Sequence, residues 1–163
     1  TVAYGQFSRL SWQWIRNDKK IHKLDEELLG GRIYSNESIK EILDISPTLK
    51  LQYNQIKNQD IKRAKEIGSF FYDLFLAIKN ASLYLKKNKY FVLVIGNRTV
   101  KNIFLRTDLI VSEIAFSLGL NTEKIFYRNI INKRMPKKNS PTNIKGQVGH
   151  TILKESIIFL KKV

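Results

Sequence analysis

The strongest constraint on the fold is a long helical pattern followed at once by an apolar run. From about Asp60 to Lys87, apolar residues recur at steps of three and four, as on one face of a helix. The residues Tyr90 to Ile95 are then continuously apolar and rich in β-forming types, and the run stops at Gly96-Asn97. This succession predicts a helix and then a strand buried on both faces, which is typical of an α/β sheet.

The residues before the long helix indicate shorter helices. Phe7, Leu10 and Trp14 have helical spacing, and Gly30-Gly31 ends a charged stretch that we interpret as a loop. Ser35 is suited to cap a helix that runs to Asp44, and Pro47 suits the first turn of the next. The expected elements are helices at about 4–16, 35–44 and 48–58, with a loop at 17–34.

After the strand, the sequence predicts a helix and two more strands. Thr107 or Asp108 can cap a helix that stops at Gly119. Strands are expected at Lys124 to Ile131 and at Ser156 to Lys161, separated by a polar stretch at 132–151. The order suits the second half of a Rossmann-like sheet that closes with an antiparallel hairpin, within one partial domain at 1–163.

Three strands with several amphipathic helices leave one sheet edge open. We therefore expect either a partner chain or an N-terminal region that completes the sheet. The first residue is Thr rather than Met, which agrees with a processed chain, a fragment or an omitted initiator region.

The charge favours a polyanionic partner. The chain has 29 Lys and Arg against 14 Asp and Glu, a formal charge of +15. Nucleic acid is the default partner of such a surface. An AT-rich genome, whose codons favour Lys, Asn and Ile, is the alternative explanation. The chain has no cysteine, which excludes disulfides and is compatible with a cytoplasmic protein. Its apolar runs are too short to span a bilayer.

Much of the charge is concentrated near the C-terminus. From Lys124 to Val163 there are ten Lys and Arg and one acid, Glu155. Cations hold a loop to phosphates, and Asn and Arg also read base edges, so the polar stretch at 132–151 is a candidate DNA-contacting loop. A solvated charged loop is the alternative.

A second candidate is the turn at 96–99, because ligands of open α/β sheets bind at the carboxyl ends of strands. A simple turn is an equal alternative there. The two histidines, His22 and His150, have no metal-ligand neighbour at short spacing, and no metal site is expected. The acidic cluster Asp25-Glu26-Glu27 is typical of a solvated face.

Three segments together resemble one family. T-V-A-Y-G-Q-F-S-R-L-S (1–11), V-I-G-N-R-T-V (94–100) and N-K-R-M-P-K-K-N-S-P-T-N (132–143) are similar, in order and spacing, to bacterial DNA methyltransferases that modify an exocyclic amino group of cytosine or adenine. The resemblance covers nearly the whole chain and corresponds to the C-terminal half of such an enzyme. It implies a Rossmann-like fold that uses S-adenosylmethionine, and direct methyl transfer to a base flipped out of the duplex.

Two motifs of that family are not in this sequence. They are the F-x-G-x-G loop that cradles S-adenosylmethionine and the S/D-P-P-Y tetrapeptide that holds the target amino group. The resemblance therefore implies a split enzyme or a fragment, inactive alone, whose cofactor is bound mainly by the missing half. No catalytic residue is assigned to this chain. A restriction–modification setting is usual for such enzymes.

By resemblance, this chain supplies the wall of the base pocket and the grip on DNA. Phe7 suits stacking or the core equally. The residues expected at the pocket are Tyr4, Arg9, Asn97 and Arg98, and those expected on DNA are Lys133, Arg134, Lys137, Lys138 and Asn139.

Two other functions remain open from the sequence. One is a non-catalytic DNA-binding subunit or an inactive remnant, which would have the same charge and the same loop. The other is a fragment of an RNA amino-methyltransferase, since such enzymes share the fold. Cytosine is favoured over adenine because the similar enzymes carry Ser in the tetrapeptide.

Overall fold

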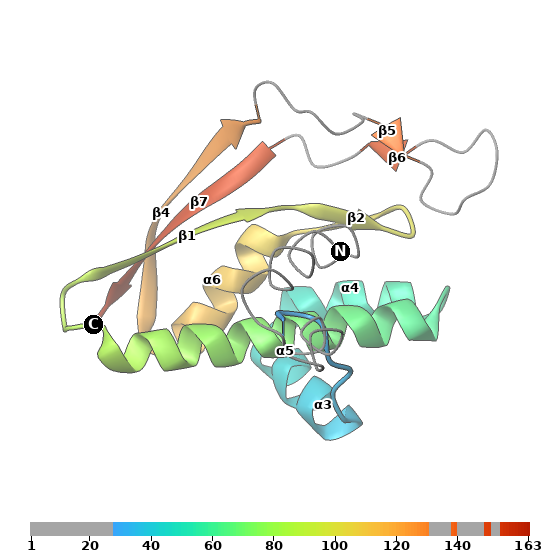
Figure 1. The fold of residues 1–163 in the computed structure, drawn as a ribbon, viewed down its shortest axis with the longest axis horizontal. Helices are drawn as coiled ribbons and strands as arrows, with labels where there is room; N and C mark the ends of the chain where they lie inside the picture. The colour runs from blue at the N-terminus through green and yellow to red at the C-terminus, as the bar shows by residue number, and fades with distance from the viewer. Residues whose placement is uncertain (1–27, 131–137, 140–148, 151–153) are drawn as a thin grey trace, which may run out of the picture.

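The structure is a computed structural model that describes residues 28–130, 138–139, 149–150 and 154–163. The helix expected at 4–16 and most of the loop at 17–34 lie outside these residues. Figure 1 shows helices gathered on one side of a three-stranded sheet. In chain order the elements are α3 (Asn36–Ile45), α4 (Pro47–Lys57), α5 (Ile61–Tyr84), β1 (Tyr90–Gly96), β2 (Arg98–Val100), β3 (Ile103–Leu105), α6 (Thr107–Ser117), β4 (Leu120–Asn129), β5 (Lys138–Asn139), β6 (Gly149–His150) and β7 (Lys154–Lys162).

The first three helices of the described residues begin at side-chain caps. Ser35 accepts from the Ser38 amide at the start of α3, which confirms the predicted cap. Ser46 caps α4, with Pro47 in its first turn as predicted, and Asp60 caps α5. These helices begin and end within a few residues of their predicted positions.

The long helix α5 is packed closely against α3 and α4. Its Gly68 lies where an added Cβ would come 2.8 Å from Ile39 Cγ2 and 3.2 Å from Tyr53 Cε2. Ile39 belongs to α3 and Tyr53 to α4, so a glycine at this position lets both helices approach α5. The buried residues of the three helices form one core with α6 and the inner face of the sheet.

The sheet has the order β1-β7-β4, and β7 pairs antiparallel with both neighbours. The mixed α/β class with a closing antiparallel strand pair is therefore confirmed. The prediction that 90–95 is buried on both faces is wrong, because β1 is half-buried on the helix side at Phe91, Leu93 and Ile95 and exposed at the positions between. An apolar run does not distinguish a strand with two covered faces from one whose outer face is bare.

A short hairpin between β1 and α6 was not predicted. Its strands β2 and β3 pair from Arg98↔Leu105 to Val100↔Ile103. Lys101 and Asn102 both have positive φ, 49° and 62°, as the two central residues of a tight hairpin turn require. The Lys-Asn pair is a weaker signal for that turn than Asn-Gly.

The start of α6 also differs from the prediction. Neither Thr107 nor Asp108 caps the helix. Arg106 occupies the cap position without a side-chain cap bond, and Thr107 is the first helical residue. The predicted stop at Gly119 is confirmed, with φ 74°. Strand β4 begins directly after this glycine, four residues earlier than expected.

Candidate functional site

The strand register brings two of the predicted regions to one end of the sheet. Gly96, the last residue of β1, lies opposite Glu155 of β7, which lies opposite Arg128 near the end of β4. The turn at Asn97-Arg98 and both attachment points of the loop at 132–151 therefore share this end of the sheet (Figure 1).

Asn97 holds the beginning of α6. Its Oδ1 accepts from the Asp108 backbone amide at 3.3 Å. Because α6 has no cap from its own N-cap side chain, Asn97 satisfies one of the amides that a helix start leaves unpaired. Arg98 follows as the first residue of β2, and it is exposed.

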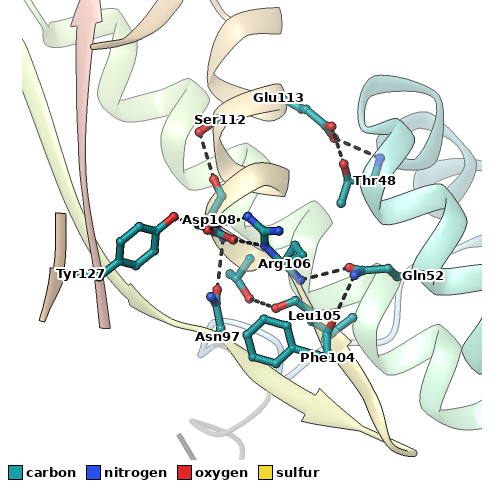
Figure 2. A network of polar contacts seen from close by, with 11 residues as sticks. Thr48, Gln52, Asn97, Phe104, Leu105, Arg106, Asp108, Ser112, Glu113 and Tyr127 are labelled. Carbon is teal, nitrogen blue, oxygen red and sulfur yellow. Dashed lines mark hydrogen bonds and ion pairs between the residues drawn. The ribbon is translucent and has the colours of Figure 1, made fainter. Parts of the chain in front are cut away.

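Asp108 is the centre of the polar network in Figure 2. Its side chain is 1% exposed, and it accepts from Arg106 Nε at 3.2 Å, Arg106 Nη2 at 3.3 Å and the Tyr127 hydroxyl at 2.9 Å. Burial raises the pKa of this carboxyl, but the hydrogen bonds from Arg106 and Tyr127 outweigh burial and keep the pKa below its ordinary value. The carboxylate therefore stays charged and fixes both partners.

Arg106 is held at its backbone as well as its side chain. The Gln52 side chain of α4 accepts from the Arg106 amide at 3.2 Å and donates to the Phe104 carbonyl at 2.8 Å. The Arg106 side chain is 43% exposed, and the hydrogen bond to Asp108 raises the pKa of its guanidinium further. The result is a permanently charged, oriented donor at the end of the sheet, a geometry suited to a phosphate or a base edge.

Glu113 anchors α6 to α4 beside this network (Figure 2). It accepts from the Ser46 hydroxyl, from the Thr48 hydroxyl at 2.6 Å and from the Thr48 amide at 3.2 Å. Glu113 thereby pairs with a backbone amide that the start of α4 would leave without a partner. Its contacts also fix α4, which carries Gln52, relative to α6, which carries Asp108.

The remaining predicted site residues are only partly described. Lys138 and Asn139 form β5, which pairs with β6 through Lys138↔His150 and Asn139↔Gly149, so part of the predicted loop is a short ladder. The other predicted residues lie outside the described part of the chain, namely Tyr4, Phe7, Arg9, Lys133, Arg134 and Lys137.

Sequence reasoning missed Gln52, Arg106 and Tyr127, and it gave Asp108 the wrong role. One signal was available, because Asp108 directly precedes the apolar run Leu109-Ile110-Val111. An acid beside a core-facing run needs a partner, and Arg106 is two residues away. The contributions of Gln52 and Tyr127 depend on long-range packing and have no local signal.

The described residues contain no cluster of His, Cys, Asp or Glu that would hold a metal ion. None of the described helices is long and apolar enough to cross a membrane.

The chain has a mixed α/β fold, and its basic loop is attached at the same end of the sheet as the polar network. This arrangement agrees with the methyltransferase class inferred from the sequence. The chain is 44% identical, over 167 aligned residues, to the Type II methyltransferase M.MvaI of Kocuria varians. The match covers 99% of this chain and 37% of the relative, so the chain spans little more than a third of that protein's length. The predicted resemblance to part of a methyltransferase is confirmed. No family model matches the chain, and no solved structure matches it.

Proposed function

We propose that this chain is part of a DNA methyltransferase that transfers a methyl group from S-adenosylmethionine to an exocyclic amino group of cytosine or adenine. In this proposal the chain forms the second half of a Rossmann-like sheet. It supplies the wall of the base pocket and the grip on DNA, and another part of the enzyme supplies the rest.

One observation carries the proposal. A chain that is 44% identical to part of a Type II methyltransferase brings Asn97 and Arg98 to the same sheet end as both attachment points of its basic loop. The ten cations and one acid of residues 124–163 give that region the sign that a polyphosphate requires.

The cofactor does not fit the residues of this chain. The sequence has neither the F-x-G-x-G loop nor the S/D-P-P-Y tetrapeptide of the family it resembles. We therefore assign S-adenosylmethionine binding and catalysis to the other part of the enzyme and derive no chemical step here.

The role assigned to this chain is to hold a distorted DNA substrate. Extracting a base from the stack costs a few kcal/mol, which contacts to the backbone and to the extracted base must offset. We assign phosphate contacts to Lys133, Arg134, Lys137, Lys138 and Asn139, and the pocket wall to Tyr4, Arg9, Asn97 and Arg98. Arg106 joins the DNA-facing set, because Asp108 holds its guanidinium in a fixed orientation at the same sheet end.

The direct test is transfer of labelled methyl groups. The purified chain, alone and with the part of the Kocuria varians relative that lies outside the match, is mixed with tritiated S-adenosylmethionine and either unmethylated DNA or RNA. We expect no label from the chain alone and label in DNA from the mixture. DNA binding without label in either mixture favours a binding subunit or remnant, and label only in RNA favours the RNA enzyme.

A matched pair of variants tests how the chain alone binds DNA. Replacing Lys133, Arg134, Lys137 and Lys138 with Ala should weaken DNA binding and lower the slope of log Kd against log salt by about 0.9 for each phosphate that the variant no longer neutralises. The control replaces four exposed helix lysines, Lys40, Lys57, Lys62 and Lys79, with Ala. Equal effects in the two variants would mean that net charge alone drives binding.

A further inference from the structure

The outer side of the sheet is an apolar surface that the described helices do not cover, here called the open face. Its exposed members on β1 and β4 are Tyr90 at 48%, Val92 at 45%, Val94 at 51% and Phe126 at 45%. Between them, at half-buried positions of β7, lie Ile157 and Phe159, each paired in register with a residue of both neighbouring strands.

This composition is unusual for a solvent-facing side. An antiparallel sheet that faces water on one side carries polar residues there, with the apolar residues turned inward. In β1 both sets are apolar, because Phe91, Leu93 and Ile95 face the helices while Val92 and Val94 face outward. Contiguous apolar patches of this kind mark interaction sites.

The aromatic members are not arranged for stacking nucleic-acid bases. Tyr90 and Phe126 meet Phe159 edge-on, with ring centroids 6.5 and 5.6 Å apart. Lys124 lies over the Phe126 ring at 4.6 Å, and Lys161 lies over the Tyr90 ring at 5.9 Å. A stacking platform needs a free ring face, and a lysine ammonium lies over one face of each of these two rings. The aliphatic centre of the surface suits the apolar side of a protein segment instead.

We propose that the open face is the docking surface for the part of the methyltransferase outside this chain. The inference rests on the proposed function. The occupant is inferred from chain length, because the match covers 99% of this chain but only 37% of the methyltransferase relative. The outer edge of β1 lies beside this surface and pairs with no other strand among the described residues, so the same partner is positioned to extend the sheet.

The test is co-purification. The part of the Kocuria varians relative outside the match carries a tag and is co-expressed with this chain, and the amount of chain retained on the tag is measured. The double variant V92K/V94K should be retained about tenfold less than the wild type or worse, because docking would bury two ammonium groups without partners. The control L51K/L83K changes two exposed leucines on α4 and α5, and it should be retained like the wild type.

A second variant controls for misfolding as the cause of lost retention. V92T/V94T keeps the β-branched shape that suits a strand and removes apolar surface, so it should be retained at an intermediate level with an unchanged circular dichroism spectrum. Retention of V92K/V94K at the wild-type level, or no retention of the wild type, would overturn the proposal. Two further results would also overturn the proposal. They are self-association of the chain, or affinity of the chain for single-stranded DNA, that is lost in V92K/V94K while this variant still binds the partner.

Methyl transfer measured on the same mixtures separates the two proposals. Label in DNA together with normal retention of V92K/V94K would overturn the docking surface and leave the function standing. Retention that depends on Val92 and Val94, without label in DNA, would overturn the function and leave the docking surface standing.

Discussion

The two faces of the sheet are built from the same three strands but differ in what covers them. On the inner face, Ile158 and Leu160 of β7 are fully buried against the helices. On the outer face, Val92 and Val94 of β1 are about half exposed although they are equally apolar. The inner face therefore stabilises this chain on its own. The outer face contributes little to the isolated chain, and its apolar surface is available for recognition.

The largest expected effect is on the inner face. Leu160→Ala should reduce the free energy of unfolding by about 2–5 kcal/mol, because it leaves a cavity beneath α6 where repacking is restricted. Urea denaturation measures the loss. Val94→Ala on the outer face is the control and should cost much less. Similar losses for both variants would show that the two faces are equally packed.

The next effect concerns the polar network at the end of the sheet. Asp108→Ala should cost about 1–3 kcal/mol, because Arg106, Tyr127 and their surroundings lose a buried acceptor. Thermal unfolding measures the loss, and Asp44→Ala, which removes an exposed ion pair with Lys50, is the control. If Asp108→Ala is as stable as the control, the network does not hold the start of α6.

The Asp108 carboxylate should also make the stability of the fold sensitive to acid. The pKa of Asp108 is lower in the folded chain than in the unfolded chain, so its ionised form stabilises the fold above the ordinary aspartate pKa. That stabilisation is lost as the pH falls below about 4 and passes through the lower folded-state pKa. The melting temperature of the wild type should therefore fall more steeply in this range than that of Asp108→Asn. Parallel curves for the two proteins would contradict the assignment.

A smaller effect is expected at Asn97. Asn97→Ala removes the acceptor for the Asp108 amide and should cost about 1 kcal/mol, the typical value of a helix cap. Asn97→Asp keeps an acceptor at the positive end of α6 and should retain most of the stability. Chemical denaturation compares the two variants. Equal loss in both would indicate that the Asn97 amide group, rather than its oxygen, is what the site requires.

The smallest effect sharpens the contrast between the faces. V92T/V94T should change the free energy of unfolding of the isolated chain by less than about 0.5 kcal/mol, as is usual for exposed positions. Its effect should appear only with the partner present. A large loss in the isolated chain, measured by urea denaturation, would mean that these valines are covered by residues of this chain.

Only part of the candidate site could be predicted from the sequence. The turn at Asn97 and Arg98 was identified because a strand that ends in Gly-Asn is a local signal, and the basic loop because charge is counted directly. Tyr127 and Gln52 were missed, because they reach Asp108 and Arg106 across 19 and 54 residues of chain. No local pattern encodes such pairs.

The sequence by itself determined the helices α3, α4 and α5, the glycine that ends α6 and the positive charge. Caps and helical periodicity act between residues a few positions apart, so their signals are local. Only the tertiary structure decided that β7 lies between β1 and β4, that the described residues leave one face of the apolar strand β1 uncovered, and that Asp108 is a buried centre rather than a cap. Strand order and burial depend on which distant segments meet, and a run of apolar residues does not specify its neighbours.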